Sequence, residues 1–414
     1  MKASLNRIAL AAMSCALAAC GGGGGGGGDN QAAAPPAITP PAITPAPVVN
    51  ATASLTNSGE FAVVGSNITL AWSSTDATTC TASGAWSGDV GKSGTKSITP
   101  NASGMTQYTI TCGSATASAS VETLPESYAI PDVKFEQFLV ANGHDDLVDG
   151  KVDTIKALGV NRIRMLSEAG VTNLDGIEAF RNIAKLEVYH QRGLPRIDPT
   201  KLTKLELLGV WDCPISTIDV SKNIKLLTFS VNETEVSTVD VSTLAKVEDL
   251  NFSNSEGRFY SLTPYYGKTK GLIALDVTKN LNLRRLTVDA NRLTSIDTSK
   301  NPQLTEFWGS YNRFTSLDFS KGNPRLWRVV VVGTPDMAST LSSLNVKNTD
   351  MTANIVNNKI SQVTTYNNPL LKQVSVSNLS AIQAVIATRP HDLIEGQARN
   401  SGFVLDSWTV LTEQ

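Results

Sequence analysis

One stretch of the chain repeats itself at a spacing of 21 residues, between Leu283 and Phe319. The positions that match in the two copies are Leu283, Leu286, Val288 and Asn291 in the first, and Leu304, Phe307, Gly309 and Asn312 in the second. A fixed period of this length is typical of a solenoid, in which each repeat forms one coil that stacks on its neighbours. The repeat therefore predicts the architecture of most of the chain before any other feature is considered.

The pattern apolar-x-x-apolar-x-apolar extends the repeat in both directions. The predicted coils begin at Val160, Ile183, Leu205, Leu226, Val247, Leu283, Leu304 and Leu326. A second apolar triplet follows about ten residues later in most coils, as at Ile215, Ile218 and Val220. We expect the first triplet to form a short parallel strand whose apolar side chains point into the coil.

This pattern resembles the short leucine-rich repeats of bacterial surface proteins, either internalin-like or of the LTSLDVSKN type, and we assign residues 160–379 to them. In this family the ninth position of each coil forms a ladder of polar side chains that bond backbone groups at a turn. That position here carries Gln191, Cys213, Thr234, Ser255, Asn291, Asn312 and Thr334. The resemblance implies that Cys213 is a ladder residue. The alternative, a catalytic thiol, would require a neighbouring base, and none is evident.

The N-terminus has the features of a secretion signal. Residues 1–19 combine Lys2 and Arg7 with a short apolar run, and the following Leu-Ala-Ala-Cys20 resembles the lipobox of bacterial lipoproteins. That resemblance implies acylation of Cys20 with fatty acids such as palmitate. Because Gly21 follows, and not Asp, it also implies anchoring to the outer membrane. The alternative is an ordinary cleavage site and a soluble secreted protein.

Residues 20–50 have the composition of a tether. An unbroken glycine run, 21–28, is followed by a proline-rich segment, 29–50. Glycine runs behave as flexible coil and proline-rich segments as extended polyproline II, so a lipid anchor and a stalk are expected. The alternative is a simple linker.

Residues 51–124 alternate apolar and polar residues in short runs separated by Gly, Ser, Asn and Pro, which predicts a β-sandwich. The sequence LAWSSTDATTCTASGAWSG with the later YTITC resembles bacterial immunoglobulin-like modules. In an oxidising compartment Cys80 and Cys112 are expected to form a disulfide. We interpret the domain as a spacer. The alternative is a glycan-binding module in which Trp86 stacks on sugars.

Two segments are expected to close the ends of the solenoid, because the first and last coils would otherwise expose their cores. Residues 125–159 form the N-terminal cap, with a helix that opens at Pro131 and buries Phe135, Phe138 and Leu139. Residues 380–414 form the C-terminal cap, where Ile382, Val385 and Ile386 have helical spacing.

The N-terminal cap also contains an acidic cluster between Asp145 and Asp153 that suggests a calcium loop. However, an EF-hand loop that began at Asp145 would have Leu147 at its third position and Lys156 at its twelfth, where oxygen ligands are required. A polar turn is therefore the favoured interpretation.

Candidate binding residues lie where the scaffold does not require them. The interval between Val247 and Leu283 is 36 residues, so about 15 residues near 256–270 form an insertion. Its aromatic residues are Phe259, Tyr260, Tyr265 and Tyr266. Outward positions of the predicted strands and turns add Tyr189, Trp211, Trp308 and Tyr311. Exposed aromatic residues on a rigid surface are typical anchors of binding sites. The alternatives are a decorative insertion and incidental surface aromatics.

Composition and motifs narrow the possible functions. A formal net charge of -2 and only 17% charged residues do not indicate nucleic-acid binding. Three histidines provide little material for metal or acid–base chemistry, and the chain has no Gly-x-Ser-x-Gly, His-Glu-x-x-His or P-loop motif. We therefore expect no enzyme activity, no cofactor and no metal.

The sequence thus predicts a mainly β, outer-membrane-anchored lipoprotein, exposed at the cell surface, which binds a protein partner through its repeats in adhesion or host and cell interaction. The alternative is a non-catalytic module that binds envelope or host glycans. A hydrolase is the least supported hypothesis.

Overall fold

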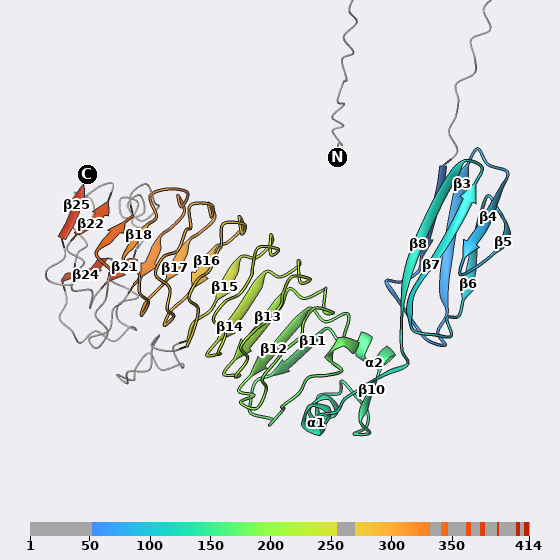
Figure 1. Cartoon of the computed structure of the whole chain (residues 1–414), viewed down its shortest axis with the longest axis horizontal. Coiled ribbons are helices and arrows are strands. Elements are labelled where there is room, and N and C mark those ends of the chain that lie inside the picture. The colour runs from blue at the N-terminus through green and yellow to red at the C-terminus, as the bar shows by residue number, and fades with distance from the viewer. Residues whose placement is uncertain are drawn as a thin grey trace, which may run out of the picture. The chain divides into compact units, whose positions relative to one another are not determined.

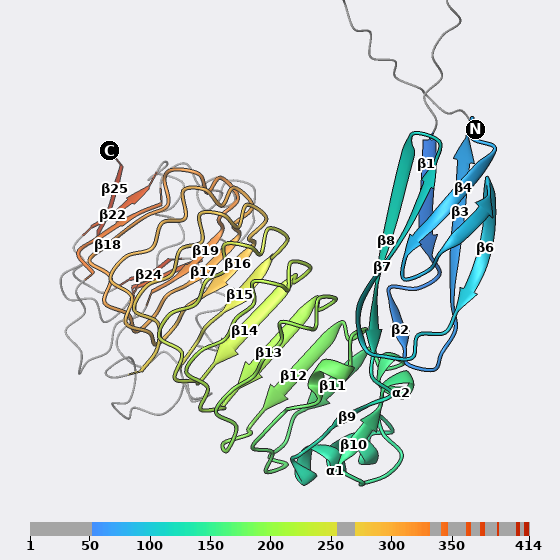
Figure 2. The same ribbon diagram turned by 45° about the vertical axis from the view of Figure 1, so that its right-hand side comes forward.

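The computed structural model describes residues 52–254, 270–331 and 341–346, and the backbone of five strands beyond residue 361. The fold is mainly β (Figure 1). A two-sheet β domain comes first, followed by a short segment that contains both α-helices, and then by a β-solenoid whose strands lie side by side (Figures 1 and 2). The predicted signal, Cys20 and the tether lie outside the described residues.

The β domain consists of two sheets around one core. The first sheet is antiparallel and contains β1 (Thr52–Asn57), β3 (Ile68–Thr75) and β6 (Ser93–Ile98). The second has the order β2 (Phe61–Val63), β8 (Ala115–Leu124), β7 (Gly104–Cys112), β4 (Thr79–Gly84) and β5 (Gly88–Gly91). Buried residues of both sheets, among them Leu70 and Ile110, belong to one hydrophobic cluster. The relationship to immunoglobulin-like modules remains a prediction.

Trp86 belongs to this core, so the hypothesis that it is a sugar-stacking platform is wrong. The side chain is only 5% exposed. Its ring meets Trp72 edge-on at 5.3 Å and Tyr108 at 6.5 Å, and its Nε1 donates to the carbonyl of Thr109. A large aromatic ring with its N–H satisfied inside the domain contributes to stability and cannot receive a ligand.

The expected disulfide between Cys80 and Cys112 is present. The two cysteines lie opposite each other on the neighbouring strands β4 and β7 of one sheet. The two cysteines are 32 positions apart in the sequence, so the link lowers the entropy of the unfolded chain and is expected to stabilise the domain by roughly 3–4 kcal/mol.

The predicted helix of the N-terminal cap is confirmed as α1 (Val133–Ala141). Asp132 caps it, because one carboxylate oxygen accepts from the backbone N–H groups of Lys134 and Phe135. The other oxygen accepts from Thr172 and Asn173 of the first coil, so a single carboxylate joins the cap to the solenoid. A two-stranded sheet, β9 (Ser127–Ala129) with β10 (Lys151–Asp153), and α2 (Thr154–Leu158) complete the segment.

The acidic cluster of the cap is arranged as a structural turn. Glu136 is 2% exposed, and its Oε1 accepts from the backbone N–H groups of residues 149, 150 and 151. Asp146 forms an ion pair with Lys156. Burial raises the pKa of Asp145. Among the described residues, no group of three His, Cys, Asp or Glu side chains is placed to hold a metal ion.

The solenoid is built on a parallel sheet of eleven strands. Each of the first eight strands begins two residues after a predicted coil start: β11 (Arg162–Met165), β12 (Lys185–Tyr189), β13 (Leu207–Trp211), β14 (Thr228–Asn232), β15 (Asp249–Asn251), β16 (Arg285–Thr287), β17 (Glu306–Trp308) and β19 (Arg328–Val330). The strands pair in register, so equivalent positions of successive coils form straight rows. The fold is therefore a leucine-rich-repeat type of β-solenoid.

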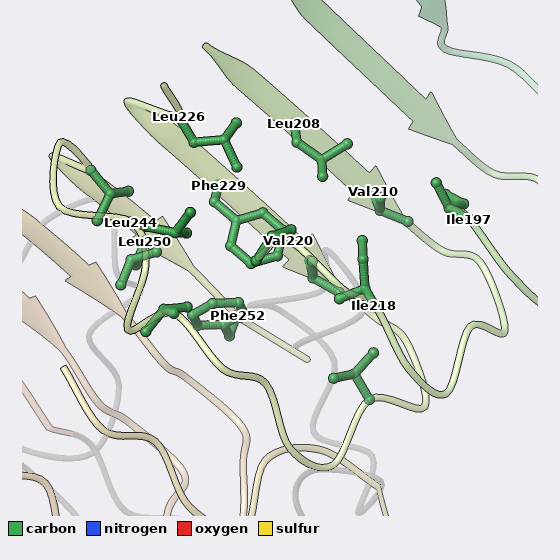
Figure 3. Packing of buried hydrophobic residues seen from close by; sticks show 14 of the residues in the cluster. Ile197, Leu208, Val210, Ile218, Val220, Leu226, Phe229, Leu244, Leu250 and Phe252 are labelled. Carbon is green, nitrogen blue, oxygen red and sulfur yellow. The ribbon is translucent and has the colours of Figure 1, made fainter. Parts of the chain in front are cut away.

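Apolar residues of the repeat fill the interior of the coils. In Figure 3 the side chains of Leu208, Phe229 and Leu250 point from three neighbouring strands into a common interior. Val220 comes from the second apolar triplet of its coil, and Phe252 meets Phe229 edge-on at 5.5 Å. Each of these side chains is at most 1% exposed, and burial of such a side chain stabilises the fold by about 1.5–3 kcal/mol.

At the C-terminal end of the strands, five of the coils turn in the same way. The eighth residue has a left-handed backbone: His190, Asp212, Glu233, Ala290 and Tyr311 have φ between 51° and 59°. The ninth residue then supplies the ladder. Asn291, for example, donates to the carbonyls of Phe252 and Val288 and accepts from the N–H of Leu272. The predicted ladder role is confirmed for Gln191, Asn291 and Asn312, while Ser255 and Thr334 lie outside the described residues.

The residues before and after the insertion are hydrogen-bonded to the same ladder residue, Asn291. The Oδ1 of Asn291 accepts both from the side-chain amide of Asn254, before the insertion, and from the backbone of Leu272, after it. Lys270, the last residue of the insertion, forms an ion pair with Glu235 at 2.6 Å. Residues 255–269, with Phe259, Tyr260, Tyr265 and Tyr266, lie outside the described residues.

Further strands continue the solenoid toward the C-terminus. β21 (Gln362–Thr365), β24 (Phe403–Leu405) and β23 (Ala387–Thr388) extend the large sheet, while β18 (Ser316–Asp318), β20 (Ser343–Asn345), β22 (Gln373–Val376) and β25 (Val410–Glu413) form a second parallel sheet. Within 380–414, β24 and β25 therefore add to the two sheets. The helical spacing predicted at Ile382, Val385 and Ile386 lies outside the described residues. The first coil also contains a 3-10 turn, η1 (Ile177–Ala179).

Candidate binding face of the repeat sheet

The outward side of strands β11 to β17 and β19 forms a continuous face, which we call the sheet face. Side chains alternate along each strand, so the third, fifth and seventh positions of a coil point away from the core. The fifth positions of successive coils lie next to one another, from Glu187 through Gly209 to Thr287, Trp308 and Val330. Because the register is constant, each residue on this face lies beside the residues at the same coil position on the two adjacent strands.

Tyr189 and Trp211 meet on β12 and β13. Their rings are 5.8 Å apart and edge-on, and His190 lies 5.2 Å from the same indole. Tyr189 lies across Gly209, because a Cβ built there would be only 3.1 Å from the tyrosine Oη. A glycine on the neighbouring strand thus provides the space that the tyrosine ring occupies. The three aromatic side chains, all half-buried, form the first aromatic cluster.

Charged groups hold this first cluster in place. Glu187 is 6% exposed and is paired with Arg162 at 2.5 Å and with Arg164 at 3.3 Å. Tyr189 donates its hydroxyl to the same carboxylate at 3.3 Å. Burial raises the pKa of Tyr189, and the Glu187 carboxylate raises it further. At the strand end, Asp212 binds both His190 and Arg192 at 3.0 Å.

A second aromatic cluster lies on β17 and β19. The guanidinium of Arg328 is 5.4 Å from the ring centre of Trp308 and 4.4 Å from that of Trp327. Such cation–π contacts contribute about 0.5–2 kcal/mol each, and more when they are shielded from water. Glu306 orients both sides of the cluster, since it accepts from Trp308 Nε1 and from Arg328.

A row of side chains with alternating charge leads from this second cluster toward the middle of the sheet face. Arg285 lies 2.9 Å from Asp249 and 3.8 Å from Glu306, and Glu306 lies 3.3 Å from Arg328. Burial raises the pKa of Asp249, and Arg285 opposes that effect. Surface ion pairs of this kind add little stability, so their main physical consequence is that the charged groups are held in order along the face.

Between the two clusters the floor of the sheet face is small and polar. Its fifth positions are Gly209, Ser230, Asn251 and Thr287, on β13 to β16. β13 and β17 are four strand spacings apart, or about 19 Å. The sheet face therefore presents two aromatic clusters separated by a shallow polar strip, a span that suits a macromolecule better than a small molecule.

The structure thus brings Tyr189 and Trp211 together but places Trp308 and Tyr311 four strands away. Tyr311 occupies the left-handed turn position after β17, at the edge of the sheet face. The sequence interpretation missed Arg285, Glu306, Trp327 and Arg328. A signal was present in the alternating signs of the third position, Asp249, Arg285, Glu306 and Arg328, one in each successive coil.

Cys213 has the geometry of a ladder residue. Its Sγ contacts the carbonyl oxygens of Trp211 at 3.4 Å and Val188 at 3.6 Å, and it is 1% exposed. Burial raises the pKa of the thiol from its ordinary value of 9.0 to about 11. A thiol protonated in this way is a weak nucleophile at neutral pH.

Comparisons with known proteins give a limited result. No protein-family model matches the chain, and no curated protein matches it. Similar solved structures include three internalins of Listeria monocytogenes. They are internalin C2 (14% identity, TM-score 0.40, 69% of this chain and 95% of that chain), the functional domain of InlJ, described as including a cysteine ladder (16%, 0.36, 70% and 72%), and InlF (17%, 0.33, 69% and 91%). At these TM-scores the similarity does not assign a family or a function to this chain. The assignment of the fold depends on the sequence repeats and on the strands themselves.

Within the described part of the chain, no helix is both long and apolar enough to cross a membrane.

Proposed function

We propose that this protein is a non-catalytic, outer-membrane-anchored lipoprotein, exposed at the cell surface, whose sheet face binds a protein partner. The observation that carries the binding proposal is the pair of aromatic clusters, Tyr189 with Trp211 and Trp308 with Arg328, on one rigid sheet. Tryptophan, tyrosine and arginine are the residues that contribute most to protein–protein interfaces. They bind well when they are held in place before association, as the ion pairs of Glu187 and Glu306 hold them here.

The span of the sheet face supports a macromolecular partner. Two clusters about 19 Å apart can be covered together by a protein surface of ordinary interface size. The polar floor at Ser230, Asn251 and Thr287 would then form the weaker contacts around and between the anchors. The lipid anchor at Cys20 and the tether at 20–50 would hold the solenoid at the cell surface and leave this face accessible to a partner.

The binding proposal is tested by crosslinking followed by affinity measurement. A photo-crosslinking amino acid at Thr287, in the floor between the clusters, would capture the partner on intact cells. The dissociation constant of the identified partner would then be measured for Trp211→Ala and Trp308→Ala, with Met105→Ala on the β domain as the control. Truncation of a central tryptophan is expected to weaken binding by about 30-fold, equivalent to about 2 kcal/mol.

Two outcomes would change the proposal. Unaltered affinity in both tryptophan variants would remove the sheet face from the interface. A glycan ligand whose binding is lost in Trp308→Ala would replace the protein partner with the glycan alternative. The surface location is tested separately by protease treatment of intact cells: repeats that stay protected until the outer membrane is opened would place them in the periplasm.

A further inference from the structure

A second surface of the solenoid lies along the edge where the chain enters each strand. Two tight turns precede β14: the N–H of Asn223 bonds the carbonyl of Val220 at 2.9 Å, and that of Leu226 bonds the carbonyl of Asn223 at 3.0 Å. The same pair of bonds precedes β13, β15, β16 and β17. The central residues of each turn form its tip. Before β14 to β17 and before β19 these central residues are exposed, apart from the half-buried Thr278, Ser299 and Gln303. We call this row of tips the turn ridge.

In each pair of turns, the second turn is the one next to the strand. The first of its two central residues is apolar in every coil of the turn ridge. These residues are Ile224, Ala245, Leu281, Pro302 and Pro324, and all are exposed. Ile224 is 57% and Leu281 is 55% exposed, whereas the neighbouring coil-start residues Leu226 and Leu283 are completely buried. Proline at the first tip position is explained by the turn, because its fixed φ suits that place. The aliphatic side chains of Ile224 and Leu281 have no such local explanation.

Basic residues flank this apolar row. The lysines at the tips are Lys222, Lys225, Lys246, Lys279, Lys300 and Lys321. All six are exposed, and none forms an ion pair with any residue that the structure describes. The tip segments 222–225, 243–246, 279–282, 300–303 and 322–325 contain no acidic residue. The turn ridge is therefore a strip of exposed lysines with aliphatic side chains along its middle. Lys222, Lys279 and Lys300 also interact electrostatically with aspartates of the same coil, at distances longer than an ion pair.

Buried asparagines hold the turn ridge rigid. The side-chain amide of Asn223 donates to the carbonyls of Pro199 and Leu202 in the preceding coil, both at 2.9 Å. Asn280, Asn301 and Asn323 each make the equivalent pair of bonds to the coil that precedes them. The tips are thus spaced like the strands, about 4.8 Å apart, and the row before β14 to β19 is about 19 Å long.

We propose that the turn ridge is a contact surface for the anionic headgroup layer of a lipid membrane. Lysines beside an anionic lipid surface are attracted to its phosphates, and aliphatic side chains between them enter the boundary of the acyl chains. Both parts are present in one row of adjacent tips, so several tips can contact the same surface.

The residue types favour a membrane over a protein partner. Protein interfaces are depleted in lysine and are centred on tyrosine, tryptophan and arginine, which describes the sheet face and not the turn ridge. Each tip of the turn ridge combines at least one basic residue with an aliphatic residue or proline, although the exact residues differ between coils. A surface that repeats these residue types matches a partner that is itself uniform.

A row of aspartates limits the width of the strip. Asp219, Asp276 and Asp297 lie three residues before a lysine of the turn ridge, and Asp240 lies three residues before Thr243. Each of the four accepts a backbone N–H from the residue two further along the chain. These hydrogen bonds lower the pKa of each carboxyl, so all four are ionised at neutral pH. Contact is therefore confined to the tips and is expected to weaken as salt rises.

The test uses vesicle flotation. The chain from residue 20 onward, with Cys20→Ser so that acylation cannot hold it to lipid, is mixed with vesicles of phosphatidylcholine alone or with added phosphatidylglycerol. We expect flotation only with the anionic lipid. Combined Lys222→Gln, Lys225→Gln and Lys279→Gln should lower the partition coefficient by about a hundredfold, or roughly fivefold per lysine. Ile224→Ser with Leu281→Ser should weaken binding at unchanged charge.

Matched variants control for charge and for folding. Lys92→Gln, Lys134→Gln and Lys185→Gln remove three exposed lysines outside the turn ridge, and Met105→Ser with Leu147→Ser removes exposed apolar side chains elsewhere. Both sets should float like the parent chain, and thermal unfolding should show that every variant is folded. No flotation of the parent chain, equal flotation with neutral lipid, or equal losses in the control set would each overturn the proposal. Loss of the captured protein partner in the ridge variants, with flotation unchanged, would also overturn it.

Discussion

The chain turns at both ends of each strand, and the two ends are stabilised in different ways. The surfaces next to the two ends also differ in how much their residues vary between coils. On the ridge side, Asn223, Asn280, Asn301 and Asn323 make the same pair of backbone bonds in four coils. At the opposite end of the strands the ladder varies, as Gln191, Cys213, Thr234, Asn291 and Asn312. The turn ridge is chemically uniform, whereas the sheet face beside the variable ladder changes residue from strand to strand.

The difference suggests how one repeat can present two kinds of surface. Where four coils use the same buried bond and each tip combines a basic residue with an aliphatic residue or proline, a partner with a uniform surface would match them. Where the outward residue changes with each coil, the order of residues along the sheet face specifies a particular partner. The predictions below test the two sides of the coil separately.

The largest effect is expected from Asn280→Ala, which removes the amide that bonds the carbonyls of Val241 and Leu244. Two buried carbonyl groups would lose their donor, so the free energy of unfolding should fall by about 3 kcal/mol. Chemical denaturation followed by circular dichroism measures the change. Asn282→Ala, two residues away, removes one exposed bond to Ala245 and should cost about 0.5 kcal/mol. Equal losses in the two variants would mean that the buried row does not support the ridge.

A smaller effect, which depends on pH, is expected at Cys213 in the variable ladder. The folded state raises the pKa of this thiol from 9.0 to about 11, so above pH 9 the unfolded chain releases a proton that the folded chain keeps. Stability should therefore fall as pH rises from 9 to 11, by on the order of 2 kcal/mol in total.

The measurement is the difference in unfolding free energy between the parent chain and Cys213→Ser across that pH range, which cancels the other titrating groups. A difference that does not change with pH would contradict the buried ladder position. The reaction of the thiol with an alkylating reagent should also be slow at neutral pH and should become fast only in denaturant.

On the sheet face, Gly209→Ala should displace Tyr189, because the new Cβ would lie 3.1 Å from its Oη and 3.3 Å from its Cε1. The expected loss of stability is about 1 kcal/mol, with a larger proportional loss in partner affinity. Ser230→Ala, at the same row position on the next strand, is the matched control. If partner binding is unchanged in Gly209→Ala, the first aromatic cluster is not part of the interface.

The smallest effect is expected from Val277→Thr on the ridge side. Asn301 Oδ1 is buried and has no hydrogen-bond partner among the described residues, whereas the equivalent oxygen of Asn323 accepts from Thr298 at 2.9 Å. A hydroxyl at 277 would supply the same donor, so the substitution should be neutral or stabilising by about 0.5 kcal/mol. Val288→Thr, in the core, should instead cost about 1–2 kcal/mol. A similar cost at both positions would show that the unpaired oxygen has no energetic consequence.

Much of the scaffold was predictable from the sequence because its signals are periodic. Each of the strands β11 to β17 and β19 begins two residues after a predicted coil start, and the cap helix and the disulfide were also predicted. Trp86 was misjudged, because a tryptophan in a strand-rich segment can face either the core or solvent. Its burial depends on Trp72 and Tyr108, which come from other strands.

The candidate site was only partly predictable for a related reason. Tyr189, Trp211 and Trp308 could be identified as outward-facing from their positions in the coil. Their partners could not, since Arg328 and Trp327 reach the second cluster from a coil that lies about twenty residues further along the chain. The turn ridge was missed because an exposed aliphatic residue in a turn has no local signature until the rows are aligned.

The sequence by itself determined the period, the coil starts and the ladder positions, since each is specified by residue types at short separations that burial requires in every coil. The tertiary structure alone decided that a tyrosine lies across a glycine on the next strand, that an arginine lies beside two tryptophans, and that five turn tips form one apolar row. The physical reason is the in-register stacking of parallel strands. It converts separations of 21 to 36 residues along the chain into neighbours about 4.8 Å apart, and it acts only once the coils are assembled.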